Sequence, residues 1–209
     1  MLLLAATLMV AARGGLLKKV DPILTADLLH VLRSMGHGDQ LCICDCNFPA
    51  AEVKHTSLTC THARRVALLH PPRMPCRQPG AIPPTDDNQV ATHTTSGKHI
   101  VLAGTDLPRA MDAILELLPL DYFVESAAGH MAPQEGASMP ELGTEVIEEA
   151  TNIVTARAEG LSLRPIERFT FYEQARKCFA VVQTLERRPY GNVILTKGVV
   201  GPDGFDLKP

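Results

Sequence analysis

The segment between Gly36 and Pro49 contains the residue types best suited to proton transfer, in the order GHGDQLCICDCNFP. His37 stands between two glycines, and Asp45 follows a run of apolar residues. An imidazole changes charge near neutral pH, so it can both accept and donate a proton, while a carboxylate can orient it or bind a hydroxyl group. Asp39 is close enough in sequence to orient His37 or to cap the turn. A lone His-Gly-Asp can equally be a structural turn with a solvated imidazole.

The neighbouring residues predict a helix before this segment and a strand within it. Thr25 can cap the start of a helix that runs to about Met35. Gly36 is expected to end this helix. Its apolar stripe follows helical spacing and comprises Leu28, Leu29, Val31, Leu32 and Met35. A buried strand is expected over 41–44. Ligand crevices in open α/β sheets lie outside the carboxyl ends of the strands, which is where Asp45 would lie.

Helical and strand patterns alternate in the second half of the chain. Asp106 is expected to cap a helix that ends before Pro119, and Gly160 to stop the longest helix. The predicted strands are 100–103, 122–125, 180–184 and 192–196, and the predicted helices are 106–118, 141–159 and 172–178, with a loop at 126–140. This order predicts an α/β fold: a single three-layer α/β/α domain with a mostly parallel sheet.

Several separated motifs resemble the L-fucose mutarotase and D-ribose pyranase family. The first is MGHGD, followed by a strand ending in Asp45 and then NFPA. The run IERFTFYEQARKCFAVV from Ile166 resembles the family's arginine–tyrosine segment, and RRPYGNVILTKGV from Arg187 resembles its Tyr-x-Asn strand. The similarity covers about residues 16–50 and 98–200. It implies the ribose pyranase-like fold and a ring-shaped homo-oligomer, often a decamer.

The resemblance also implies a reaction and the residues that perform it. The reaction is the interconversion of the α and β anomers of L-fucose or a related monosaccharide, which needs acid–base groups and no cofactor or metal. The implied catalytic residues are His37, Tyr172 and Tyr190. The implied sugar ligands are Asp45, Arg168, Tyr190 and Asn192.

Three other functions fit the same motifs. One is a pyranase acting on ribose, although the Phe-Pro after Asn47 and the Tyr-Gly-Asn from Tyr190 favour the fucose branch. The second is a sugar-binding or regulatory module without turnover. The third is an interaction protein whose central segment binds a metal or a partner.

Residues 51–97 are expected to form a disordered insertion in a domain that otherwise covers 16–209. The segment has six prolines and no apolar periodicity, and a long segment of this kind is usually disordered or functional. It also contains zinc-ligand residue types, namely His55, Cys60, His62, His70, Cys76 and His93. Their spacing matches no paired zinc motif, so zinc is predicted to be dispensable.

Composition narrows the choice of partners and compartment. The net charge of −3 and the lack of a basic stripe argue against nucleic acid. Three cysteines alternate along one predicted strand, a poor geometry for disulfides. Reduced thiols and a cytoplasmic location are therefore expected.

The first fifteen residues are expected to be an extension without a catalytic role. Met1–Ala12 is nearly all apolar, yet shorter than the roughly 20 residues that a transmembrane helix needs. No basic residue precedes Arg13, unlike in a signal peptide. A buried or interface helix, a weak targeting segment and a misassigned start codon all remain open, and no membrane association is expected.

Overall fold

The structure is a computed structural model that describes residues 16–50 and 94–209. The predicted extension and the candidate zinc ligands of the predicted insertion lie outside the described residues. Within the described ranges, no group of three or more His, Cys, Asp or Glu side chains could hold a metal ion. No helix in these ranges is long and apolar enough to cross a membrane.

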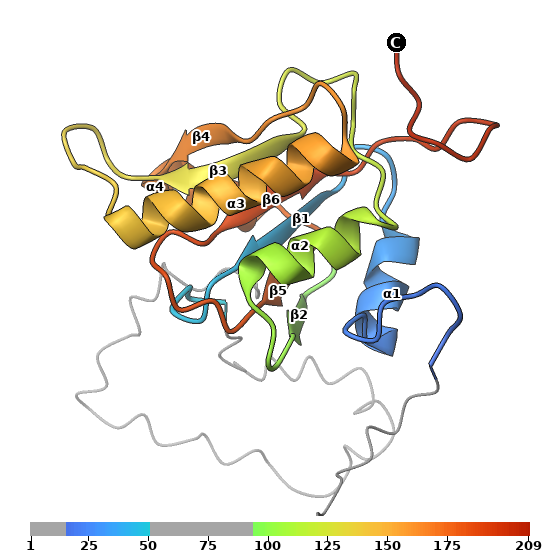
Figure 1. The fold of residues 1–209 in the computed structure, drawn as a ribbon, viewed down its shortest axis with the longest axis horizontal. Coiled ribbons are helices and arrows are strands. Elements are labelled where there is room, and N and C mark those ends of the chain that lie inside the picture. Colours follow the sequence, from blue (N-terminus) through green and yellow to red (C-terminus); the bar gives the residue numbers. More distant parts are fainter. Residues whose placement is uncertain (1–15, 51–93) are drawn as a thin grey trace, which may run out of the picture.

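Six strands form one mixed sheet in the order β2-β5-β1-β6-β3-β4 (Figure 1). They are β1 (Gln40–Cys44), β2 (Lys98–Val101), β3 (Ala128–Ala132), β4 (Arg164–Glu167), β5 (Ala180–Gln183) and β6 (Val193–Thr196). Strand β5 runs parallel to β1 and β2, and β3 runs parallel to β4. Among these six described strands, only the pairs that β6 makes with β1 and β3 are antiparallel, so the predicted α/β fold with a mostly parallel sheet is confirmed.

Helices cover both faces of this sheet (Figure 1). The larger apolar core lies between the sheet and α1 (Ala26–Ser34), α2 (Leu107–Leu115) and α3 (Glu141–Arg157). The smaller core lies under α4 (Arg168–Ala175). The predicted caps are confirmed, since Thr25 Oγ1 accepts a hydrogen bond from the Leu28 N–H (3.2 Å) and Asp106 Oδ1 accepts one from the Arg109 N–H (2.9 Å).

The predicted strand at 122–125 is wrong, because β3 forms six residues later, within the predicted loop. The Asp121 carboxylate accepts a hydrogen bond from the Phe123 N–H at 2.9 Å, which turns the chain there. In β3, Gly129 allows close packing: a Cβ on it would lie 2.3 Å from Ile166 Cδ1. Strand β3, with the sequence AGHMA, contains few residue types that favour strands, which is why its pattern does not predict it.

Several helix boundaries also differ from the prediction: α2 ends at Leu115, α3 at Arg157 and α4 at Ala175, each two or three residues before its predicted end. Helix α4 begins at Arg168 because the Glu167 side chain caps it, accepting hydrogen bonds from the N–H groups of Phe169 and Thr170. Helix α1 ends before Gly36: its C-cap residue Met35 is already extended.

The antiparallel β6 defines two opposite edges of the sheet. Its amino end lies beside the carboxyl end of β1, where Val193 pairs with Ile43, and its carboxyl end lies beside the start of β1, where Thr196 pairs with Gln40. We call the edge with the carboxyl ends of β1, β3 and β4 the pocket edge. The edge that carries the link between α1 and β1 is the link edge.

Candidate active site

A cavity of about 190 Å³ opens at the pocket edge. Sites for drug-sized ligands are larger, roughly 300–1,000 Å³, so this cavity suits one small molecule such as a monosaccharide. Its lining comprises Asp45, Asn47, Phe48, Met131, Arg168, Tyr172, Pro189, Tyr190 and Asn192. The four residues predicted to bind sugar and both predicted catalytic tyrosines are therefore brought together.

Asp45 and Asn192 form a buried polar pair at the base of this cavity. The Asn192 Nδ2 donates to Asp45 Oδ2 at 2.8 Å, and the Asp45 N–H donates to Asn192 Oδ1 at 3.1 Å. The Asn47 N–H donates to Asp45 Oδ1 at 2.9 Å. An ionised carboxylate has about four acceptor sites, so Asp45 can still accept hydrogen bonds from sugar hydroxyls.

Burial raises the pKa of Asp45 above its ordinary value of 3.8. Hydrogen bonds from Asn192, Asn47 and Phe48 lower this pKa, and the negative charge of Glu186 raises it. Since the native pKa is the higher one, the ionised carboxylate lowers folding stability at neutral pH. This cost is absent below the ordinary pKa and develops as the pH rises through the native pKa.

We expect sugar affinity to fall on acidification at a pH above the ordinary pKa of Asp45, because a protonated carboxyl loses acceptor sites. Affinity should approach a tenfold loss per pH unit once Asp45 must release a proton to bind. NMR titration of L-fucose across the acidic range measures it. In Asp45→Asn, binding should be weaker and lose this pH dependence; an unchanged profile would show that another group titrates.

One wall of the cavity is built from α4. The Arg168 Nε donates to the Tyr172 hydroxyl at 3.4 Å, and its guanidinium carbon lies 5.8 Å from the centre of the Tyr172 ring. The hydrogen bond to Tyr172 raises the pKa of Arg168 above its ordinary value, so this side chain is a permanent cation. Phe48 supports the wall, with its ring centre 5.5 Å from that of Tyr172. This wall offers a fixed donor and aromatic surface to a sugar ring.

Tyr190 is held in an uncommon backbone conformation, with a φ of 64°. Left-handed backbone costs free energy in a residue other than glycine, and it persists only where the surroundings enforce it. Such positions concentrate at functional sites. The strained turn places Tyr190 in the lining of the cavity.

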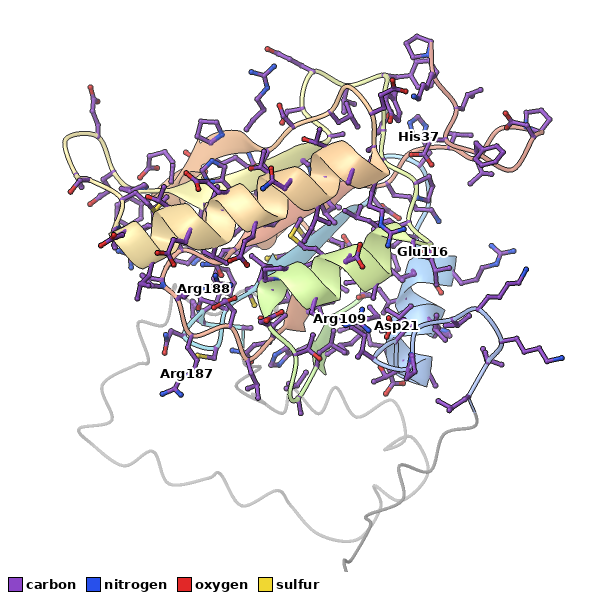
Figure 2. The ribbon with its side chains drawn as sticks, viewed as in Figure 1. Asp21, His37, Arg109, Glu116, Arg187 and Arg188 are labelled. Atoms are coloured by element: carbon purple, nitrogen blue, oxygen red, sulfur yellow. The ribbon has the colours of Figure 1, made fainter. Side chains whose placement is uncertain are left out.

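His37 lies at the link edge, away from this cavity. Its side chain is 53% exposed, and its Nε2 lies 2.9 Å from Oδ2 of Asp121, whose side chain is 2% exposed. Strand β1 separates the two edges, and a rise of about 3.3 Å per residue puts His37 and Asp45 roughly 20 Å apart. Figure 2 shows His37 and Arg188, which precedes the Pro189–Tyr190 turn, on opposite sides of the molecule.

Sequence reasoning missed Asp121 as the partner of His37. Asp39 has the second of its two predicted roles, which was to cap the turn. Its Oδ2 accepts a hydrogen bond from the Gly36 N–H at 2.7 Å. The pair of His37 and Asp121 is 84 residues apart in sequence, and the misplaced strand at 122–125 hid it. The signal available in the sequence was the position of Asp121, an acidic residue two positions after Pro119, which was expected to end the preceding helix.

Comparisons with known proteins identify relatives over almost the whole chain. Fucose mutarotases of Danio rerio and Homo sapiens are 32% identical over 192 residues and 35% identical over 184 residues. These matches cover 90% and 88% of this chain, and 97% and 94% of the two relatives. The fucose mutarotase of Streptococcus pneumoniae, solved in complex with L-fucose, is 26% identical with a TM-score of 0.62 and covers 88% of this chain and 100% of that chain.

The sequence profile described as the RbsD / FucU transport protein family matches residues 18–70 and 84–200. The break between these two ranges falls inside the predicted insertion. The matched ranges include every residue of the pocket, together with His37 and Asp121. The chain therefore belongs to the RbsD / FucU transport protein family.

Proposed function

We propose that the protein is a sugar mutarotase, an isomerase that interconverts the α and β anomers of L-fucose or a closely related monosaccharide. The observation that carries this proposal is the small cavity in which Asp45 and Asn192 face Arg168 and two tyrosines. This set offers acceptors, a fixed donor and phenols for proton transfer, as a neutral polyhydroxyl ligand requires. Relatives named fucose mutarotase support the choice of sugar.

The proposed reaction needs two coordinated proton transfers. One group takes the proton of the anomeric hydroxyl, whose oxygen forms the carbonyl, while the C1–O5 electron pair moves to the ring oxygen. A second group gives that oxygen a proton. After rotation about C1–C2 the reverse steps close the ring with the opposite anomeric configuration. Each positioned acid–base group typically contributes about 10²–10⁴-fold, and no step needs a cofactor or a metal.

We assign the proton transfers to His37 and to a phenol of the pocket, Tyr190 or Tyr172. Because His37 lies at the link edge, it would reach a pocket in a neighbouring copy of the chain. Its exposed imidazole is suited to this, since the bond from Nε2 to Asp121 leaves Nδ1 for the sugar. Apolar surface for such a contact lies close to Asp121 in the sequence. It is provided by the exposed side chains of Phe123 (54% exposed) and Val124 (40% exposed).

The same proposal includes a homo-oligomer, of the ring form that the family resemblance implies. It takes residues 16–209 as the mutarotase domain and 1–15 as an extension. We place the protein in the cytoplasm, because its four described cysteines (Cys42, Cys44, Cys46 and Cys178) are free and a reducing compartment keeps thiols in that state.

The second candidate function is sugar binding without turnover. The separation of His37 from the cavity in a single copy favours it, because an isolated chain contains the sugar ligands but not the imidazole in one place. Only the oligomer would combine them.

Anomer exchange measured by saturation-transfer NMR distinguishes the two functions. We expect the purified protein to accelerate exchange of L-fucose more than that of ribose, galactose or arabinose at equal concentration. Binding of L-fucose without faster exchange, at a concentration where the protein is oligomeric, would establish the binding module instead. Faster exchange of ribose than of fucose would make the protein a pyranase.

A further inference from the structure

A buried carboxylate that does not line the cavity holds the turn before Tyr190. Glu186 is only 3% exposed. Its Oε1 accepts hydrogen bonds from the N–H groups of Arg187 (3.0 Å) and Arg188 (2.9 Å), and its Oε2 accepts one from the Leu107 N–H at 3.4 Å. These contacts fasten the start of the turn to the first residue of α2.

Arg188 joins Glu186 to a second carboxylate on α3. Its Nε and Nη2 donate to Oε1 and Oε2 of Glu186 at 3.0 and 2.8 Å. Its Nη1 and Nη2 also donate to Oε1 and Oε2 of Glu149 at 2.8 and 3.2 Å. Paired, charge-assisted hydrogen bonds of this kind fix geometry as well as position. Burial alone would raise the pKa of Glu186, but the bonds from Arg188 outweigh it and the pKa lies below its ordinary value.

The same carboxylate side chain supports the residue that follows Tyr190. A Cβ on Gly191 would lie 2.7 Å from Glu186 Cγ and 3.7 Å from Asp45 Cβ, so the backbone at Gly191 rests directly on Glu186. The Glu186 carbonyl in turn accepts a hydrogen bond from the Cys46 N–H at 3.0 Å. Glu186 therefore contacts the chain on both sides of Tyr190 and the turn that carries Asp45.

This arrangement accounts for the strained tyrosine. Left-handed backbone at Tyr190 persists only if neighbouring residues are fixed on both sides. Arg188 is fixed before it and Gly191 after it, and both are fixed through Glu186. A tyrosine whose backbone is held this way would keep its place in the cavity lining without rearrangement, which favours efficient proton transfer.

We propose that Glu186 and Arg188, braced by Glu149, form a clamp whose role is to position the Tyr190 phenol, and that the clamp sets the catalytic rate without contacting the sugar. The inference rests on the proposed mutarotase function and names Tyr190, rather than Tyr172, as the phenol that transfers the proton. The three residues are positioning residues, because they act through Tyr190.

Adjacent arginines provide a matched test. Arg187 is exposed and points away from the ribbon, whereas Arg188 lies against it (Figure 2). Arg188→Ala should lower kcat by about 10²-fold, the cost typical of a small misplacement of a reacting group, with little change in KM. Arg187→Ala should leave both constants unchanged. Glu149→Gln, at a carboxylate whose side chain is 51% exposed, keeps the inner pair and should lower kcat less than Arg188→Ala.

A double-mutant cycle separates positioning from a general effect on the fold. If Arg188 acts through the phenol, Arg188→Ala should cost little further rate in a Tyr190→Phe background. An equal loss in both backgrounds, or an equal loss in Arg187→Ala, would overturn the proposal. Should Arg188→Ala fail to fold, Glu149→Gln takes its place in the cycle, and an unchanged kcat in that variant would also overturn it.

A second readout does not depend on turnover. The chain has three tyrosines, so labelling with 3-fluorotyrosine gives three ¹⁹F signals that single Tyr→Phe variants assign. Arg188→Ala should shift or broaden the Tyr190 signal and leave that of Tyr122 unchanged; an unmoved Tyr190 signal would reject the clamp. If the wild-type protein exchanges no sugar, the mutarotase proposal fails, and this signal still tests the clamp.

Discussion

His37→Ala should reduce anomer exchange by about 10²–10⁴-fold, the usual cost of losing one acid–base group, while the fold remains intact. The side chain is 53% exposed and its one hydrogen bond among the described residues is to Asp121, so its removal leaves no cavity in either apolar core. Sugar binding should weaken much less, because the proposed sugar ligands of the cavity are unchanged.

Saturation-transfer NMR, circular dichroism and a sugar titration together measure this outcome. His30→Ala is the matched control: His30 is exposed on α1 and has no proposed role, so exchange should stay at the wild-type rate. Near-normal exchange in folded His37→Ala would contradict the mechanism and leave proton transfer to the phenols of Tyr172 and Tyr190.

Coexpression of two inactive variants tests whether His37 acts in a neighbouring pocket. Mixed oligomers of His37→Ala and Tyr190→Phe should regain activity, since random assembly pairs an intact imidazole with an intact pocket at about one quarter of the sites. No recovery in mixed oligomers would mean that both residues must come from one chain.

Gly198→Ala should lower the free energy of unfolding by about 3 kcal/mol, at the upper end of the usual cost of overpacking. A Cβ on Gly198 would lie 2.2 Å from the Leu120 carbonyl oxygen and 2.8 Å from Asp121 Cα. Both are backbone atoms, so no side-chain rotation relieves the collision. The backbone that carries Asp121 must move, and exchange should fall with stability because His37 loses its partner.

Urea unfolding followed by circular dichroism measures the loss, with Gly36→Ala as the control. The nearest atom to a Cβ on Gly36 is Asp39 Oδ2 at 3.7 Å, an ordinary contact. That substitution should change stability by no more than about 1 kcal/mol. If the two variants were equally stable, the backbone at Leu120 would move away from the added Cβ at a lower cost in free energy than these close contacts indicate.

The pocket residues could be predicted because strand ends gather them. Asp45 follows β1 and Arg168 follows β4, while Tyr190 and Asn192 precede the antiparallel β6, so all four reach the pocket edge. Their residue types suit a sugar, and their motifs resemble one family. Local sequence and resemblance were sufficient for this part of the site.

The contacts that hold the site in place were not predictable, because they join distant segments. Glu186 looks like an ordinary acidic residue beside two arginines, and its burial depends on α2 and α3 packing over it. The pair of His37 and Asp121 depends on the two residues that follow β6, which join the two segments. The Lys197 N–H donates to the Asp39 carbonyl at 2.9 Å, and the Gly198 N–H donates to the Pro119 carbonyl at 2.9 Å. Periodicity describes single elements and does not contain this information.

The length of β1 has a consequence for how activity depends on protein concentration. With the imidazole and the proposed sugar ligands at opposite ends of that strand, a dissociated subunit of the proposed oligomer would bind sugar without converting it. Dilution below the dissociation constant of the assembly would then abolish catalysis while binding persists, by mass action alone. A factor that promotes or prevents subunit association in the cell would then convert the same chain between a sugar-binding protein and an isomerase.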